Sequence, residues 1–106
     1  MVKRGEIWLV NLDPIVGSSA RATRPCVVVS PTELNEQLQT VLLVPLSSTS
    51  KAAPFRVPVT HAGKKGAILI EQCTSTEKAR LLKRVGSLSS GTLEKALGTL
   101  RELFAD

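Results

Sequence analysis

An arginine at a predicted loop-to-strand junction is the side chain in this sequence best placed to act on a phosphate. Arg24 follows a polar stretch, residues 17–23, and precedes Pro25 and an apolar run. A proline favours an extended backbone at the residue before it, so a rigid strand can hold the planar guanidinium fork toward phosphate oxygens. The structural alternative is a surface ion pair with Glu33 or Glu71, and composition does not choose between the two interpretations.

Two serine hydroxyls are the second candidate for chemistry. Ser47 and Ser48 end the apolar run of residues 40–46, which is typical of a buried strand. Hydroxyls at such a strand end either contact a ligand or cap the turn that follows, and the sequence leaves both alternatives open.

Few other residues could serve as bases, nucleophiles or metal ligands. His61 is the only histidine, so a two-histidine mechanism is excluded and a Ser-His-Asp triad would have to form in a turn-like stretch. Cys26 and Cys73 lie far apart without metal-ligand spacing, so we expect no metal site and no cofactor. Cys26 is expected to behave as a small core residue, while a disulfide to Cys73 stays open.

One glycine-lysine motif matches a known phosphate clamp in a different context. Residues 63–66, Gly-Lys-Lys-Gly, fit the GxxG loop of KH domains, which joins two helices. Strand-like segments flank the motif here, so a charged hairpin tip is the better interpretation. His61 beside it is then expected to be a solvated loop residue.

Length and charge bound the class of protein. The chain has 106 residues, 42% of them hydrophobic, which suits a single domain over residues 1–106. Such a domain buries roughly 65% of its unfolded surface, enough for one modest core. The formal charge is +5, which raises the expectation of a polyanionic partner. Residues 37–70 contain no acid and four cations: Lys51, Arg56, Lys64 and Lys65.

No targeting segment or membrane span is expected. The first residues run directly into a strand-like pattern, and no apolar stretch approaches the roughly 18 residues of a membrane helix. The expected compartment is therefore cytoplasmic, with no membrane partner.

Short apolar runs predict a sheet. Runs rich in strand formers and separated by proline and glycine turn signals are typical of strands. The expected strands cover residues 6–12, 25–30, 40–46, 55–59, 67–70 and 82–88, the last with a bulge at Gly86. Residues 61–66 suit a hairpin connection, residues 31–35 a short helical turn or loop, and residues 74–82 a turn or two of helix capped by Ser75.

The end of the chain changes to helical periodicity. After Ser90, an N-cap candidate, apolar residues recur on one face: Leu93, Ala96, Leu97, Leu100, Leu103 and Phe104. Many short strands followed by a terminal helix predict a mainly β fold, a small and strongly curved antiparallel sheet or barrel plugged by that helix.

Several motifs together resemble the signatures of MazF/PemK-type toxins of toxin–antitoxin modules. They are KRGEIWLVNLDP at residues 3–14, Gly17-Ser18, RPCVVVS at residues 24–30, Asn35, VPLSSTSK at residues 44–51, FRVPV at residues 55–59 and AILIEQ at residues 67–72. The motifs occur in family order over nearly the whole chain, so their joint agreement is more specific than any one of them.

The resemblance implies a fold and an activity. The fold is an SH3-like antiparallel β-barrel, the CcdB/MazF-like toxin fold, in a homodimer. The activity is that of a sequence-specific, metal-independent endoribonuclease, which cuts single-stranded RNA to 2′,3′-cyclic phosphate and 5′-hydroxyl ends and so inhibits translation and growth. A cognate MazE-like antitoxin is implied as a partner, and we expect it to cover the basic groove with an acidic, disordered segment.

The resemblance also assigns site residues. The catalytic arginine and threonine of the family fall on Arg24 and Ser47, where serine keeps the hydroxyl. The implied RNA contacts are Ser18, Ser19, Arg21, Ser48, Lys51, Glu71 and Gln72. Ser19-Ala20 replace an acid and a glutamine common in the family, and Leu69 stands where some relatives carry an arginine. Glu71 is left as an acid that could act in proton transfer or bind the RNA, and the general acid and base stay unassigned.

A non-enzymatic CcdB-like toxin, which binds DNA gyrase with the same barrel, is the alternative function. Such toxins depend on an exposed aromatic-aliphatic C-terminal tip. Phe104 is in phase with the apolar helix face and is expected to pack with it, so the sequence favours the nuclease.

Overall fold

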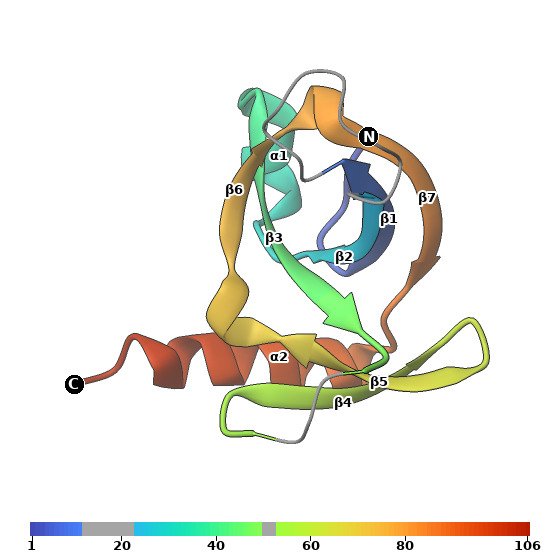
Figure 1. Cartoon of the computed structure of the whole chain (residues 1–106). Helices are drawn as coiled ribbons and strands as arrows, with labels where there is room; N and C mark the ends of the chain where they lie inside the picture. Colours follow the sequence, from blue (N-terminus) through green and yellow to red (C-terminus); the bar gives the residue numbers. More distant parts are fainter. Residues whose placement is uncertain (12–22, 50–52) are drawn as a thin grey trace.

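The structure, a computed structural model, describes residues 1–11, 23–49 and 53–106. It consists of an antiparallel sheet and a C-terminal helix (Figure 1). The strands are β1 (Glu6–Asn11), β2 (Thr23–Val28), β3 (Thr40–Ser47), β4 (Arg56–His61), β5 (Lys64–Leu69), β6 (Thr74–Glu77) and β7 (Leu81–Ser87). The helices are α1 (Thr32–Gln37) and α2 (Ser90–Leu103), and short 3₁₀ turns are η2 (Ile70–Gln72) and η3 (Lys78–Arg80).

The sheet is strongly curled. Its strand order is β4-β5-β3-β2-β1-β7, and β6 pairs separately with β3. The pairing of β1 with β7 skips Leu82 and Val85, so two bulges bend the last strand, one of them beside the predicted position at Gly86. α2 runs alongside the β4–β5 hairpin (Figure 1). The predicted fold class, a curved antiparallel sheet with a terminal helix, is confirmed.

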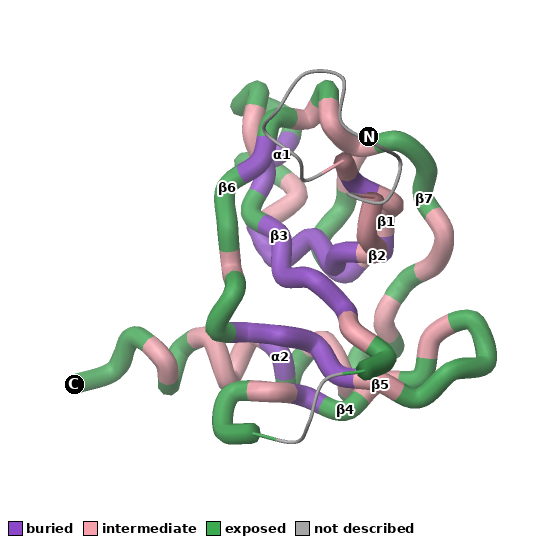
Figure 2. The backbone as a smooth tube through the Cα atoms, in the orientation of Figure 1, coloured by how far each residue is buried: buried purple, intermediate pink, exposed green. Residues whose placement is uncertain are grey.

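Side-chain alternation divides the apolar residues of the sheet between two clusters. One cluster lies between the sheet and α2 and includes Val27 and Val44. The other lies on the opposite face and includes Cys26, Val28 and Leu43. Because neighbours along a strand point to opposite faces, the continuous apolar runs of β2 and β3 supply both clusters. β3 is buried along most of its length, and β2 is buried over its second half (Figure 2).

One face of α2 covers the first cluster. Ala96 is buried there, and the leucines at positions 97, 100 and 103 pack against the same cluster. The N-cap is Ser89, whose hydroxyl accepts a hydrogen bond from the Thr92 backbone N–H at 3.3 Å. The predicted helix is therefore confirmed, with its cap one residue before the expected Ser90.

Phe104 does not pack with this helix face. α2 ends at Leu103, and the Phe104 side chain beyond it is 77% exposed. The expectation that Phe104 is part of the packed face is wrong, because the helix ends at Leu103 and the ring beyond it faces mostly solvent. The exposure of Phe104 therefore does not exclude a CcdB-like C-terminal tip.

Residues 74–82 form a strand and a 3₁₀ turn, so the predicted helical turns are wrong. β6 runs antiparallel to β3 and sets Thr76 opposite Val41. Thr76 is buried, and a β-branched side chain suits a pleated surface. Pairing with the first half of β3 outweighs the local capping signal of Ser75.

A buried asparagine ties α1 to the sheet. The Asn35 amide donates hydrogen bonds to the carbonyl oxygens of Ser30 at 3.1 Å and Val2 at 3.3 Å, and its oxygen accepts one from the Ser30 hydroxyl. That hydroxyl accepts in turn from the Leu42 backbone N–H at 3.0 Å. A buried polar network with every member satisfied fixes the connection between β2 and β3.

β2 begins two residues earlier than predicted and so contains Arg24. Pro25 lies opposite Leu9 of β1, whereas the pairing of β2 with β3 begins only at Cys26. The missing proline N–H therefore removes no hydrogen bond to β3, and Arg24 is held by β1 on one side.

The predicted hairpin at residues 61–66 is confirmed, with a two-residue turn. Ala62 and Gly63 connect β4 to β5 with φ values of 53° and 76°. Positive φ at both central positions matches the right-handed twist of the strands, and Asn-Gly is the preferred pair there. Alanine at the first position is strained.

Ala62→Asn should therefore raise the free energy of unfolding by about 0.5–1 kcal/mol, because asparagine tolerates the left-handed region better than alanine does. Urea denaturation of both proteins measures the change. Ala79→Asn, an exposed alanine of η3 with negative φ, is the control and should give no gain. A lower stability for Ala62→Asn than for the wild type would contradict the turn geometry.

Candidate active site

Arg24 and Ser47 belong to one face of neighbouring strands. The register of β2 and β3 pairs Cys26 with Pro45. No pair precedes Cys26, but the same register continued by two residues would place Arg24 opposite Ser47, the last residue of β3. Because side chains two residues apart share a face, both lie on the face that carries Cys26. The Arg24 guanidinium reaches the residue next to Ser47, but Ser47 is not among the residues that line the groove of Arg24.

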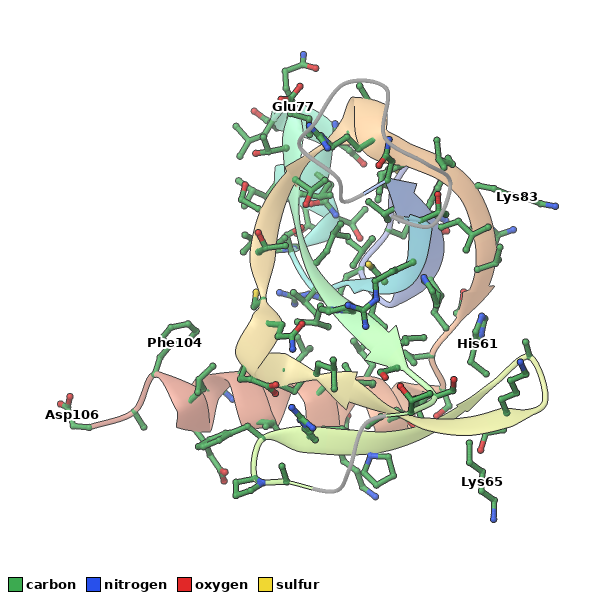
Figure 3. All side chains as sticks on the ribbon, viewed as in Figure 1. His61, Lys65, Glu77, Lys83, Phe104 and Asp106 are labelled. Atoms are coloured by element: carbon green, nitrogen blue, oxygen red, sulfur yellow. The ribbon has the colours of Figure 1, made fainter. Side chains whose placement is uncertain are left out.

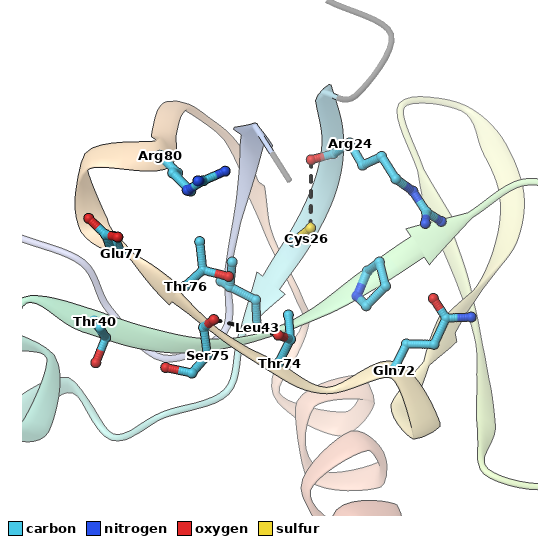
Figure 4. Close-up of a pocket in the computed structure, with 11 residues that line it drawn as sticks. Arg24, Cys26, Thr40, Leu43, Gln72, Thr74, Ser75, Thr76, Glu77 and Arg80 are labelled. Carbon is cyan, nitrogen blue, oxygen red and sulfur yellow. Dashed lines mark hydrogen bonds between the residues drawn. The ribbon is translucent and has the colours of Figure 1, made fainter. Parts of the chain in front are cut away.

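The Arg24 guanidinium reaches the end of β3. Its Nη2 atom donates a hydrogen bond of 3.2 Å to the Leu46 carbonyl oxygen, and the side chain extends toward that strand end (Figure 4). Among the described residues Arg24 forms no ion pair with Glu33 or Glu71, so the ion-pair alternative is wrong. One bond to a carbonyl uses one of five N–H donors, so the fork can still hold an anion.

The Ser47 hydroxyl caps the end of β3. It accepts a hydrogen bond from the Thr49 backbone N–H at 3.3 Å and lies 3.4 Å from the Thr49 hydroxyl. The turn-capping interpretation is confirmed. It is compatible with contact to a ligand, because a hydroxyl has one donor and two acceptor positions.

Arg24 lines a groove of about 450 Å³ (Figure 4). Strands β2 and β3 supply an apolar floor, and β6, η2 and η3 supply polar side chains. The lining residues are Arg24, Cys26, Thr40, Leu43, Pro45, Gln72, Thr74, Ser75, Thr76, Glu77 and Arg80. Hydroxyls and two guanidinium groups along one groove suit a polyanionic chain.

Sequence reasoning missed part of this groove. Arg80 reaches it from η3, where its Nη1 atom donates a hydrogen bond of 3.3 Å to the Asn11 carbonyl oxygen. Thr74 and Thr76 reach it from β6. The alternation of these threonines was the available signal for a strand, but the expectation of helical turns over residues 74–82 concealed it.

The other predicted contacts are divided among several places. Gln72 lines the groove with Arg24 (Figure 4), whereas Glu71 is not among its lining residues. Ser48 is exposed and lines a separate cavity on the far side of Ser47. Four predicted contacts lie outside the described residues: Ser18, Ser19, Arg21 and Lys51.

Glu71 forms an ion pair with Arg56 of β4. The Arg56 Nη2 atom lies 2.9 Å from Glu71 Oε2, and Nε lies 3.3 Å from the same oxygen. Hydrogen bonding from Arg56 lowers the pKa of the Glu71 carboxyl, against a smaller opposing effect of burial. A carboxylate held ionised in this way is a poor proton donor near neutral pH.

Both cysteines are free, so the disulfide alternative is wrong. Cys26 is fully buried in the floor of the groove, as expected for a core residue, and burial raises the pKa of its thiol to about 11 despite the nearby Arg24. Cys73 is half-buried, and burial raises the pKa of its thiol as well.

His61, at the end of β4, does not line the groove. Nowhere in residues 1–11, 23–49 and 53–106 do three or more His, Cys, Asp or Glu side chains gather in a group that could hold a metal ion. No helix in this part of the chain is long and apolar enough to cross a membrane.

Comparison with known proteins decides the family. Residues 3–104 match the family described as PemK-like, MazF-like toxin of type II toxin-antitoxin system. The chain belongs to this toxin family. Endoribonuclease PemK of Escherichia coli is 32% identical over 109 residues, with 97% of this chain and 82% of that protein covered. Endoribonuclease MazF9 of Mycobacterium tuberculosis is 36% identical over 104 residues, with 88% and 87% covered.

Solved structures share the PemK/MazF architecture. MazF (Form-I) from Deinococcus radiodurans superposes with a TM-score of 0.80 at 26% identity, with 96% of this chain and 94% of that chain covered. A MazE-MazF structure from the same organism gives 0.81 at 24% identity, with 98% and 95% covered. The resemblance carried by the sequence motifs is confirmed, and these matches favour a PemK/MazF toxin over the CcdB-like alternative.

Arg56→Ala should raise the pKa of Glu71 toward the ordinary value of about 4.3, since the hydrogen bond that lowers it is lost. At pH values above the pKa that Glu71 has in the unfolded chain, the ion pair contributes its full stabilisation to the folded protein. This stabilisation is lost as the pH falls through the lower pKa that Glu71 has in the folded protein. NMR titration of the Glu71 side-chain carboxyl measures the shift. Arg84→Ala removes an arginine of β7 and should leave the Glu71 titration unchanged. The same Glu71 pKa in wild type and Arg56→Ala would contradict the ion pair.

Iodoacetamide should modify Cys73 well before Cys26, because Cys26 is fully buried and its raised pKa keeps the thiol protonated near neutral pH. Mass spectrometry of digested samples taken over time gives the two rates. Both thiols should react quickly in denaturant, which serves as the control. Equal rates for the folded protein would show that Cys26 is accessible.

Proposed function

We propose that this toxin is an endoribonuclease that cuts single-stranded RNA, with Arg24 and Ser47 as its catalytic pair. The observation that carries the proposal is the Arg24 hydrogen bond to the carbonyl oxygen of Leu46, the residue before Ser47, which brings the guanidinium to the end of β3. Such a pair suits a phosphodiester group, whose oxygens accept hydrogen bonds and carry charge. The nuclease names of the PemK and MazF9 relatives support the same reaction class.

The proposed reaction is an intramolecular transesterification. The ribose 2′-hydroxyl attacks its own 3′-phosphate and loses its proton, and a new P–O bond forms as the bond to the 5′-oxygen of the next nucleotide breaks. The leaving oxygen takes up a proton. The products are a 2′,3′-cyclic phosphate and a 5′-hydroxyl, with no external nucleophile consumed.

Arg24 stabilises the crowded anionic phosphorane through which this reaction passes. A preorganised donor aimed at developing charge contributes about 2.7–4 kcal/mol of transition-state stabilisation. Ser47 donates a hydrogen bond to a non-bridging phosphate oxygen. Glu71 is assigned no proton transfer, because Arg56 holds its carboxylate; we propose instead that the general acid and base lie elsewhere.

The groove holds the RNA beside the cut. Arg24 and Arg80 attract its phosphates, Gln72 and the β6 hydroxyls make polar contacts to its bases, and Ser48 contacts it at the end of β3. No aromatic side chain is among the residues lining the described groove, so base recognition relies on polar contacts rather than stacking. Arg21 and Lys51 are proposed as further backbone contacts.

Two protein partners complete the proposal. A second copy of the chain packs on the apolar surface around Leu42 and Phe104, which are 41% and 77% exposed and border a groove of about 470 Å³. A MazE-like antitoxin covers the basic groove, as the MazE-MazF structures of a related toxin suggest.

Arg24→Ala should lower RNA cleavage at least about 100-fold with little loss of folding stability, because it removes the main stabilising charge. The assay incubates purified protein with a long unstructured RNA in EDTA and maps the new ends. Arg84→Ala removes the same charge from β7, where the side chain is 58% exposed, and should cut at nearly the wild-type rate. If the wild type makes no discrete cuts, the proposed nuclease function is overturned. Cuts that require added metal would overturn the metal-independent mechanism. Rapid cutting by Arg24→Ala would overturn the catalytic role of Arg24.

A further inference from the structure

A second cavity lies beside Ser47, separate from the groove of Arg24. Its volume is about 280 Å³. Pro25, Leu46 and Val59 form apolar walls, and Ser48, His61 and Lys64 add polar groups. Its residues therefore come from the strand that carries Arg24, the strand that ends at Ser47, and the β4–β5 hairpin.

The hairpin packs tightly against the proposed catalytic serine. Ala67 of β5 is paired with Ser47, and a Cβ atom added at Gly66 would collide with the Ser47 carbonyl oxygen. Only glycine permits this approach. Ser47 lines the cavity, so a phosphate bound at its hydroxyl would place one of the neighbouring nucleotides near the cavity mouth.

The histidine side chain contributes to the far wall. Figure 3 shows the His61 side chain directed toward the end of β7 rather than out into solvent. Its Cε1 atom lies 3.5 Å from where a Cβ on Gly86 would stand, so the ring lies beside the β7 backbone at Gly86. His61 also lines a neighbouring groove of about 640 Å³, so this residue is shared by that groove and the smaller cavity.

The chemistry of this cavity fits a nucleobase. Flat apolar walls suit the faces of a heterocyclic ring, and polar groups at the edge suit its hydrogen-bonding atoms. Lys64 can only donate hydrogen bonds, while the Ser48 hydroxyl can donate one. Donors that face C6 of a purine or C4 of a pyrimidine favour the carbonyl oxygens that guanine and uracil carry there over the amino groups of adenine and cytosine.

We propose that this cavity binds the base of a nucleotide adjacent to the cut and selects guanine or uracil over adenine or cytosine. Lys64 is the specificity-determining residue, and it donates to the carbonyl oxygen of that base. This assignment rests on the proposed nuclease function and adds to it a site on the opposite side of Ser47 from the Arg24 groove.

Two neighbouring lysines provide a matched test. Lys64 lines the cavity, whereas Lys65 does not, because adjacent side chains of a strand point to opposite faces. Both are exposed, and Lys65 points away from the sheet in Figure 3. Lys64→Met and Lys65→Met remove the same charge and keep the apolar stem. The experiment sequences the ends produced from a random-sequence RNA library by wild type and both variants.

The wild type should prefer guanine or uracil at one position next to the cut. Lys64→Met should reduce that preference roughly fivefold or more at this position alone, and Lys65→Met should retain the wild-type preference. Unchanged preference in Lys64→Met, or an equal change in both variants, would overturn the cavity assignment while the nuclease function stands. Absence of cutting by the wild type would overturn both proposals.

Discussion

The antiparallel register of β2 on β3 is the constraint on which the rest of the structure depends. Cys26 pairs with Pro45, and strand alternation then assigns every other side chain of both strands to a face. On one face Val27 and Val44 join the cluster beneath α2. On the other face, Arg24 stands near the start of β2 and bonds to the Leu46 carbonyl oxygen, next to Ser47 at the end of β3. A slip of one residue would exchange the two faces, placing the arginine against the helix and apolar side chains in the groove.

Several features outside the site hold this register. The Asn35 network fixes the connection between the two strands through hydrogen bonds to Ser30 and Val2. Gly66 allows β5 to pack against the Ser47 backbone, so the end of β3 is supported from the side opposite the groove. These contacts position the backbone of both candidate catalytic residues without using their side chains, which leaves the arginine fork and the hydroxyl available to a substrate.

The sequence predicted the parts of the fold whose side chains are apolar. The runs at 25–30 and 40–46 became β2 and β3, and the leucine periodicity became α2, because burial of apolar surface determines those elements. β6 was not predicted, since its threonine and serine side chains are polar and carry little hydrophobic signal, and its strand state depends on pairing with β3. Phe104 follows the helical spacing of the leucines before it, but this spacing does not show that the helix ends at Leu103 and leaves the ring exposed.

The site, like the fold, was predictable only in part, because some of its contacts depend on the pairing of strands distant in sequence. The motifs named Arg24, Ser47 and Gln72 as site residues. They also left Glu71 available as a proton donor or acceptor. Only the pairing of β4 with β5 brings Arg56 to Glu71, fifteen residues apart in sequence, and this ion pair removes Glu71 from the candidate acids and bases. Arg80 enters the groove through η3, an element that follows from the unpredicted strand. Charge pattern alone could not distinguish the cations that line the groove from those on other surfaces.

A double-mutant cycle on RNA cleavage tests most directly whether Arg24 and Ser47 act on one phosphate. The rates of wild type, Arg24→Ala, Ser47→Ala and the double variant give the coupling between the two side chains. The shared-phosphate account predicts that the double variant loses much less activity than the product of the two single losses. A double loss equal to that product would show that the two residues act independently, and would contradict the account.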